Sequence, residues 1–239
     1  MQTQDIDYRA GAVNLRGYLA FDESKAGQRP GVLVFHEGLG LGDFAMARAR
    51  RISELGYVAF AADMFGDRRN ARNLTEVAKL VGDLRAETDT LRDRARAALV
   101  TLAATPQVDA SRMAAIGFCF GGSVVLELAR DGADLKAAVS FHGALTTLTP
   151  AVPGKVKPSV LVLTGADDPL APAEQVKAFE DEMRAAGVRD WQVVSYGNTL
   201  HGFTNPAADG SMLRTAMYSA QADRRSWASM RSLFDEVFQ

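Results

Sequence analysis

The sequence predicts an α/β protein with a mostly parallel central sheet flanked by helices. Short β-branched or apolar runs alternate along the chain with longer helical patterns, which is what helical crossovers between parallel strands produce. Several of the apolar runs, such as Gly31 to Phe35 and Ser159 to Leu163, show no alternation of apolar with polar residues. Strands of that kind are typical of the centre of a parallel sheet, where both faces are buried.

The strands are predicted over the apolar runs, one after another. Gly and Pro residues fall between the periodic segments and do not collect into a linker, and no internal repeat is present, so one domain over residues 1–239 is expected. The predicted strands are Ala12 to Ala20, Val32 to His36, Val58 to Ala61, Met113 to Gly117, Ala137 to Phe141, Val160 to Thr164 and Trp191 to Tyr196.

Helical patterns fill the intervals between these strands. The second pattern is long and is interrupted by Gly82, which predicts that it forms two helices. The helical segments are Phe44 to Leu55, Asn73 to Ala104, Gly122 to Ala129, Pro172 to Ala186 and Met212 to Phe238.

Composition excludes several classes of protein. The 239 residues are 47% hydrophobic and 23% charged, and 27 Lys and Arg against 29 Asp and Glu leave no basic surplus for nucleic acid. The single cysteine, Cys119, excludes an internal disulfide and a zinc site with several thiolates. The first residues contain early acids, and no apolar run approaches the roughly 20 residues of a membrane span, so a soluble cytoplasmic protein without a membrane partner is expected.

The most informative stretch runs from Met113 to Leu128, where a strand-like run meets Gly-Phe-Cys-Phe-Gly-Gly and continues as a helix. This is the nucleophile-elbow pattern G-x-S-x-G with cysteine in the place of serine. The small residues Gly117 and Gly121 allow a cramped strand-to-helix turn. The turn is expected to hold the side chain of Cys119 above the sheet at a helix N-terminus, whose partial positive charge favours a thiolate.

An isolated cysteine is more often an inert buried thiol, but the flanking glycines at a strand-to-helix junction favour a nucleophile. Such a nucleophile needs a histidine base and an orienting acid, in the chain order nucleophile, acid, histidine. Of the three histidines, His36 and His142 end predicted strands, whereas His201 lies just after the last strand and well past the elbow. The order therefore selects His201.

The acid is expected in the loop Gly165 to Pro172, at the strand ends where sites of open parallel sheets lie. Asp167 and Asp168 are adjacent in this loop, and for either of them the structural alternative is to cap a turn beside Pro169. Turn chemistry alone leaves the choice between the two aspartates open.

These residues are shared with a known family: the chain resembles the dienelactone hydrolase family of α/β-hydrolases over essentially its whole length. The resemblance implies the α/β-hydrolase fold and a Cys-His-Asp triad carried here by Cys119, His201 and Asp168, acting on an ester or lactone without a metal or an organic cofactor. The blocks that carry it are Val34 to Gly40, Gly56 to Gly66, Gly117 to Gly122, Gly165 to Pro172 and His201 to Phe203.

The resemblance further implies an oxyanion hole made by the backbone N–H groups of Phe120 and Gly38. Two preset donors stabilise the charge on the attacked carbonyl oxygen, and losing one donor typically costs about 10²- to 10³-fold in rate. The family's acidic residue beside the nucleophile corresponds to Glu37. We expect Glu37 to hydrogen-bond Cys119 or to fix the oxyanion loop, and a salt bridge to a nearby Arg is the structural alternative.

His142 and Phe203 are candidates for lining the pocket, although a histidine such as His142 is more often a hydrogen-bonded structural residue. His36 has no further ligands at suitable spacing, so no metal site is expected. Family members specialised for dienelactone carry an arginine shortly after the histidine of the triad, whereas the segment His201 to Pro206 contains none. The resemblance therefore favours a hydrolase without favouring dienelactone as its substrate.

Two functions are compared on this basis. In a cysteine hydrolase, His201 takes the proton of Cys119, the thiolate attacks an ester or lactone, and water cleaves the resulting thioester. In the alternative, the fold keeps its pocket for ligand binding or thiol-based sensing. A complete triad favours the hydrolase, because a binding pocket needs no base and orienting acid in series. The expected partner is a small-molecule ester or lactone, and the expected assembly is a monomer or a homodimer.

Overall fold

The computed structural model describes residues 1–239 and confirms the α/β class, with eight strands and six helices along the chain. Contacts between Cα atoms divide the chain into two compact units, Met1–Ile116 and Gly117–Gln239. The expectation of a single domain stays a prediction.

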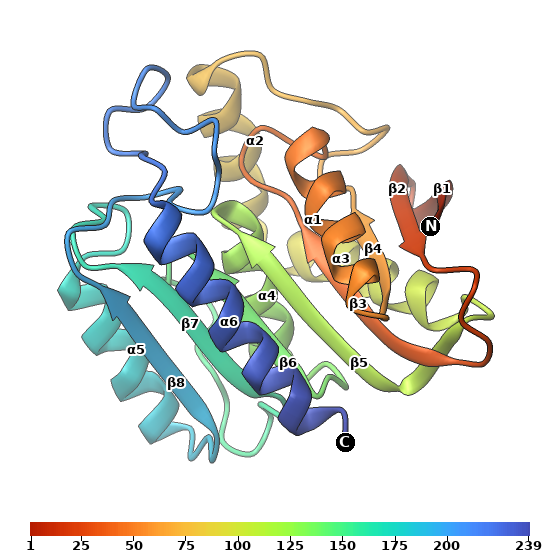
Figure 1. Ribbon diagram of the computed structural model, residues 1–239. Coiled ribbons are helices and arrows are strands. Elements are labelled where there is room, and N and C mark those ends of the chain that lie inside the picture. The colour runs from red at the N-terminus through yellow and green to blue at the C-terminus, as the bar shows by residue number, and fades with distance from the viewer. The chain divides into compact units, whose positions relative to one another are not determined.

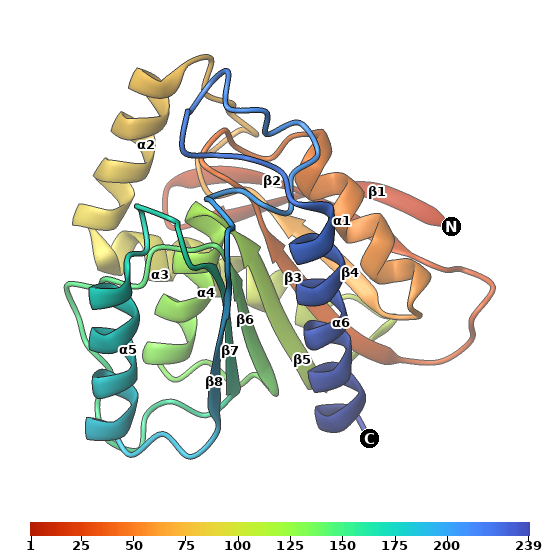
Figure 2. The same cartoon turned by 60° about the vertical axis from the view of Figure 1, so that its left-hand side comes forward.

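The first unit contains β1 (Gln2–Ala10), β2 (Val13–Phe21), β3 (Arg29–Phe35), α1 (Asp43–Glu54), β4 (Val58–Ala62), α2 (Leu74–Ala86), α3 (Thr88–Ala103) and most of β5 (Val108–Phe118). Its strands follow the order β1-β2-β4-β3-β5. β2 is antiparallel to both of its neighbours, whereas β3 and β4 are parallel. Helix α1 lies on one face of these strands and α3 on the other (Figure 2).

The second unit contains the last two residues of β5, α4 (Phe120–Arg130), β6 (Ala137–Phe141), β7 (Ser159–Gly165), α5 (Ala173–Ala185), β8 (Trp191–Tyr196) and α6 (Ala220–Val237). Strands β6, β7 and β8 are parallel and adjacent in that order. Helices α4 and α5 cover one face of these strands and α6 covers the other (Figure 1).

The uninterrupted apolar runs form central strands, as predicted. β3, β4 and β6 are buried at every residue. Because strands of this kind are covered on both faces, the polar side chains that follow them collect in the loops at their carboxyl ends. These loops contain the residues that the sequence singles out for chemistry.

The secondary structure differs from the sequence predictions at three places. Strand β1 was not predicted, because most of its residues are exposed and it is defined by a complete antiparallel register with β2. The long helical pattern forms two helices, as predicted, but it breaks at Glu87, where φ is −106° and ψ is 67°. Gly82 lies inside α2 with open space around it. The last helix begins after Ser219, whose side chain accepts a hydrogen bond from the N–H of Ala222, so the residues from Met212 to Ser219 are not helical.

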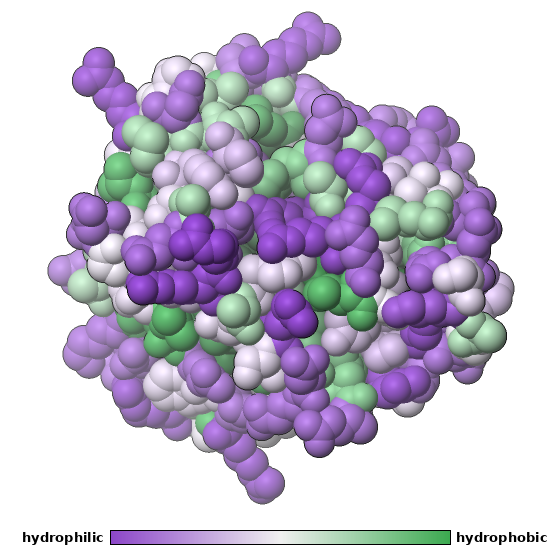
Figure 3. All heavy atoms as spheres, in the orientation of Figure 1, coloured by the Kyte–Doolittle hydropathy of each residue, from purple (hydrophilic) through white to green (hydrophobic).

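The exposed apolar residues do not come from one segment. On the face drawn in Figure 3, hydrophilic residues predominate and apolar residues are scattered between them. None of the helices combines the length and the apolar character needed to cross a membrane. The exposed large apolar side chains belong to Met1, Leu74, Val100, Leu148, Val152, Leu170, Met212 and Met217.

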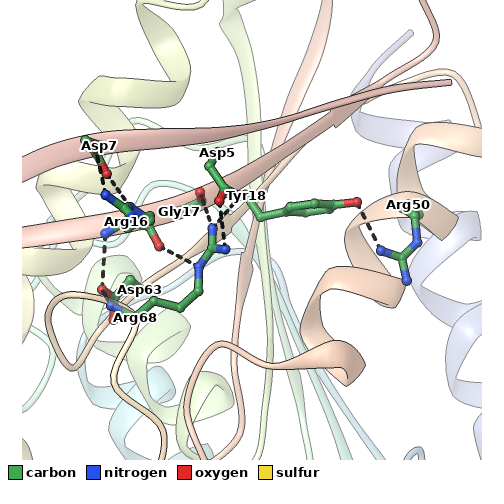
Figure 4. Close-up of polar contacts among 8 residues, drawn as sticks. All are labelled: Asp5, Asp7, Arg16, Gly17, Tyr18, Arg50, Asp63 and Arg68. Atoms are coloured by element: carbon green, nitrogen blue, oxygen red, sulfur yellow. Dashed lines mark hydrogen bonds and ion pairs between the residues drawn. The ribbon is translucent and has the colours of Figure 1, made fainter.

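A buried carboxylate, Asp63, organises the turn after β4. Its Oδ1 atom accepts hydrogen bonds from the backbone N–H groups of Phe65 and Gly66, at 2.9 and 3.0 Å. Its Oδ2 atom accepts two more, from the N–H groups of Arg16 and Arg68 at 3.1 and 2.7 Å (Figure 4). Oδ1 thus holds the turn, and Oδ2 joins the turn to β2.

Candidate active site

Cys119 occupies a sharp turn between β5 and α4, as the elbow pattern predicts. Its φ of 54° lies in the left-handed region that residues other than glycine rarely adopt, and it is the N-cap residue of α4. A Cβ atom on Gly117 would lie 2.0 Å from the carbonyl oxygen of Gly121, so only glycine fits there. The thiol is free and partly exposed. The turn therefore holds a strained, accessible cysteine at the start of a helix.

The end of β6 packs directly against this turn. The ring of Phe141 stacks on that of Phe118 with centroids 4.7 Å apart, and its carbonyl oxygen accepts a hydrogen bond from the N–H of Cys119 at 3.0 Å. A Cβ atom on Gly122 would lie 2.9 Å from the Cα of Gly143, so the helix start and the strand end meet backbone to backbone. These contacts fix the main chain of Cys119.

The loop after β7 brings Asp168, and not Asp167, to the site. Asp168 is 1% exposed, whereas Asp167 is an exposed residue of the same turn. The Oδ1 atom of Asp168 accepts a hydrogen bond from the N–H of Leu170, and Oδ2 accepts one from Nδ1 of His201, both at 2.8 Å. One carboxylate oxygen is thus fixed by the turn and the other is directed at an imidazole.

His201 lies in the long loop between β8 and α6, drawn in blue in Figure 2. Its N–H donates to the carbonyl of Thr215 at 3.0 Å, and its own carbonyl accepts from the N–H of Met217 at 2.9 Å. Because Nδ1 donates to Asp168, Nε2 is the ring atom left for proton exchange. Nε2 is buried and has no aligned hydrogen-bond partner.

The proton affinity of His201 is set by its two neighbours. Burial by itself lowers the pKa of His201, but the negative charge of the Cys119 side chain and the hydrogen bonds with Asp168 and Cys119 outweigh burial and raise this pKa to about 10. An imidazole with such a pKa keeps its proton at neutral pH. Cys119, His201 and Asp168 therefore interact as one chain of groups.

The two pocket candidates, His142 and Phe203, are both fully buried. The ring of His142 meets the rings of His201 and Phe203 edge to face, with centroids 5.2 and 5.0 Å apart. The Nδ1 atom of His142 accepts a hydrogen bond from the N–H of Cys119 at 3.1 Å, and its Nε2 atom lies 2.8 Å from Oγ1 of Thr204. Both candidates are therefore packed among the site residues and hidden from solvent.

Thr204 is a site residue that the sequence did not indicate. It is fully buried, and its hydroxyl group contacts a ring that lies 62 residues earlier in the chain. A threonine three residues after a histidine has no distinguishing pattern, so only the fold identifies it.

The predicted residues of the first unit lie in the turn after β3. His36 is buried, and both of its ring nitrogens have backbone partners. Nδ1 donates to the carbonyl of Glu37 at 2.6 Å, and Nε2 accepts from the N–H of Met64 at 3.2 Å. Burial lowers the pKa of His36. Gly38 packs closely on α2, where a Cβ atom would lie 2.8 Å from Cγ1 of Val77. The roles expected for Glu37, Gly38 and Phe120 stay predictions. No group of three or more His, Cys, Asp and Glu side chains is arranged to hold a metal ion.

Comparison with known proteins gives matches along nearly the whole chain. A family model described as "Dienelactone hydrolase family" matches residues 15–238. A protein of Yersinia pestis named "Putative carboxymethylenebutenolidase" is 28% identical over 236 residues, which cover 93% of this chain and 84% of that protein.

Two solved structures are similar over their full length. One, named m3DLH, is 46% identical, covers 100% of this chain and 99% of its own, and has a TM-score of 0.95. The other, a dienelactone hydrolase-like promiscuous phosphotriesterase named P91 from metagenomic libraries, is 45% identical with the same coverage and a TM-score of 0.93. The backbone described above is therefore shared with both of these proteins from end to end.

Proposed function

Because this chain belongs to the dienelactone hydrolase family, which has the α/β-hydrolase fold that the sequence predicts, we propose that it cleaves an ester or lactone bond of a small molecule with Cys119 as the nucleophile. Family membership supports the class of reaction. The observation that carries the rest is the chain of groups in which Asp168 bonds Nδ1 of His201 while Cys119 interacts with the same ring.

The first half of the proposed reaction forms a thioester. The Cys119 sulfur attacks the carbonyl carbon, so that a C–S bond forms and the carbonyl π electrons move to oxygen. When the tetrahedral intermediate collapses, the bond to the leaving oxygen breaks, and Nε2 of His201 gives its proton to the departing alkoxide. With a lactone, the alcohol remains attached to the acyl group, because both belong to one molecule.

The second half releases the acid. Nε2 of His201, now neutral, takes a proton from water, and the water oxygen attacks the thioester carbon. The C–S bond breaks, a carboxylic acid leaves, and the sulfur and imidazole return to their starting proton count. Asp168 acts throughout by orienting the ring and stabilising its charged form, and it does not exchange a proton itself.

The oxyanion is assigned to two backbone donors under this proposal. Phe120 supplies one, because it is the first residue of α4 and the N-terminus of a helix carries partial positive charge. Gly38 supplies the other, and Glu37 modulates the nucleophile or fixes this loop. These three assignments rest on the family resemblance of the turn after β3 and of the elbow.

The proposal is tested with a panel of short p-nitrophenyl esters and small lactones, using wild type and Cys119→Ala. We expect turnover in wild type and none above background in the variant, because the variant lacks the nucleophile. Acid quench followed by intact-protein mass spectrometry should show one acyl group added to wild type and none to Cys119→Ala. Thermal unfolding of both proteins controls for loss of the fold.

The competing function is ligand binding or thiol sensing without turnover. It is favoured if wild type is no faster than Cys119→Ala on every substrate while the thiol still reacts with iodoacetamide. Wild type that is inactive and also has an unreactive thiol contradicts both the hydrolase and thiol sensing, and leaves ligand binding.

A second candidate activity is cleavage of phosphotriesters. It is favoured by the 45% identity with the protein named a promiscuous phosphotriesterase. In this reaction the Cys119 sulfur forms a bond to phosphorus as a phenolate leaves, and water then replaces the sulfur. Adding diethyl p-nitrophenyl phosphate to the same panel tests it, since release of p-nitrophenolate should again require Cys119.

A further inference from the structure

We infer that His142 and Thr204 are positioning residues of the proposed hydrolase: they fix the main chain of the nucleophile and connect it to the loop that carries His201. The catalytic part of this inference rests on the proposed function. The positioning itself is argued from hydrogen bonds and ring contacts that do not depend on that function. Neither residue is assigned to the triad or to the oxyanion hole.

The first contact is to the nucleophile itself. The N–H of Cys119 is shared between two acceptors at the end of β6, the carbonyl oxygen of Phe141 at 3.0 Å and Nδ1 of His142 at 3.1 Å. A ring nitrogen accepts a hydrogen bond only when it carries no proton, so His142 is neutral with its hydrogen on Nε2. The imidazole therefore acts here as an acceptor for the strained backbone of the elbow.

The second contact follows from that tautomer. With the hydrogen on Nε2, His142 donates to Oγ1 of Thr204 at 2.8 Å, and both groups are fully buried. Thr204 belongs to the same loop as His201 and lies three residues after it. One ring thus connects the amide of the nucleophile with the loop of the histidine that serves it.

The backbone at His142 supports a fixed role. Its φ of 40° is positive, in the region that His, Asn and Asp enter more readily than other side chains but still rarely. Residues held in this region persist only where the surrounding structure determines them, and they cluster at functional sites. The strain at His142 thus matches the strain at Cys119, and a hydrogen bond joins the two residues.

The ring of His142 also limits where His201 can lie. The ring centroids of His142 and His201 lie 5.2 Å apart, edge to face, and the ring of Phe203 also meets that of His142 edge to face, with centroids 5.0 Å apart. A misplacement of about 1 Å between reacting groups can cost about 100-fold in rate. Removing the His142 contacts should therefore reduce the rate of reaction more than the binding of substrate.

Matched variants separate these contacts. His142→Asn keeps an acceptor oxygen where Nδ1 lies and tolerates a positive φ, but it loses the bond to Thr204. Thr204→Val loses the same bond from the other side, and Thr204→Ser keeps it. His142→Leu loses both. The measurements are kcat and KM on a p-nitrophenyl ester, the rate of Cys119 alkylation by iodoacetamide, and the thermal midpoint.

We expect Thr204→Ser to match wild type, and His142→Leu to lower kcat by about 10- to 100-fold with little change in KM. His142→Asn and Thr204→Val should lower kcat to a similar, smaller extent. Because both remove one shared bond, the double variant should be no slower than either single variant. The alkylation rate should fall in the same order.

The inference is overturned if the losses in kcat follow the thermal midpoints across the set, or if the His142→Asn and Thr204→Val effects add in the double variant. A rise in KM at constant kcat would instead make these residues part of the substrate site. If His142→Leu does not fold, the remaining variants still decide the result. If wild type hydrolyses nothing, the proposed function fails, whereas the alkylation order continues to test the positioning.

Discussion

Two of the buried aspartates, Asp63 and Asp168, use their hydrogen bonds differently. In the first unit, the two carboxylate oxygens of Asp63 accept four hydrogen bonds, and all four donors are backbone N–H groups. In the second unit, Asp168 accepts one backbone N–H on Oδ1 and gives Oδ2 to the ring of His201. Burial is the same, at 0% and 1% exposure, so burial does not distinguish them.

The comparison shows what separates a carboxylate that binds only the backbone from one that also binds a titratable side chain. Backbone N–H groups do not titrate at ordinary pH, so the hydrogen bonds of Asp63 hold its turn together without any change of charge. The donor of Asp168 is the imidazole of His201, which is a titratable group. Asp168 therefore keeps one oxygen for the fold and one for a group that changes its charge.

The largest expected effect tests whether the hydrogen bond between Asp168 and His201 is needed for the reaction. Asp168→Asn should lower kcat/KM on an ester by about 10⁴-fold. The asparagine presents either an NH₂ group or an uncharged oxygen to Nδ1 of His201, so it no longer holds the imidazole in the tautomer and orientation that the reaction needs. The stability of the protein should fall much less than its activity. Rates and urea unfolding of the purified variant measure both quantities.

Asp167→Asn is the matched control for this prediction. It makes the same chemical change one residue earlier, on an exposed side chain of the same turn. If the two variants lose activity equally, the hydrogen bond from His201 to Asp168 is not what the reaction uses.

The next effect tests Asp63. Asp63→Asn should reduce the free energy of unfolding by about 3 kcal/mol, because in either orientation the amide NH₂ faces two backbone N–H groups that now lack an acceptor. Urea unfolding followed by circular dichroism measures the change. Activity per folded molecule should fall far less than in Asp168→Asn.

The control for Asp63 is Asp67→Asn, four residues later in the same turn. Asp67 is exposed and has a φ of 47°, which asparagine adopts as readily as aspartate. Equal destabilisation by the two variants would show that the four N–H bonds of Asp63 do not account for its effect.

The smallest effect sharpens the comparison by following the proton on His201. Because the charge of Cys119 and the bond with Asp168 raise the pKa of His201 to about 10, the imidazolium persists below that pH and is lost above it. The NMR titration of the His201 ring should therefore have its midpoint near pH 10 in wild type. In Cys119→Ala that midpoint should fall, because the interactions with Cys119 that raise the pKa of His201 are lost.

One outcome of this pH series would contradict the prediction. A midpoint that is the same in both proteins would mean that Cys119 does not raise the pKa of His201.

The elbow was predictable because its signals are local. Gly117, Cys119 and Gly121 lie within one turn of chain, and the steric reason for each glycine is the contact seen between them. The apolar runs of β6 and β8 were equally local, and their predicted bounds match the structure.

Other features depend on partners far away in the sequence. Residue patterns did not separate Asp167 from Asp168, because the difference lies in which side chain meets His201 after the chain has folded. The bond between His142 and Thr204 spans 62 residues and leaves no trace in local sequence. Strand β1 is likewise defined by its pairing with β2, since its own residues are mostly polar.

The main-chain bonds that join His201 to Thr215 and Met217 have a consequence for how such an enzyme diversifies. The N–H of Tyr218 also donates to the carbonyl of Ala208, at 2.7 Å. These bonds anchor the chain on both sides of the stretch 210–214, which can therefore change length or composition while the imidazole stays in register. Lengthening a surface excursion costs little entropy once its ends are tied. Laboratory evolution aimed at new substrates should therefore accumulate insertions in that stretch and spare the anchors.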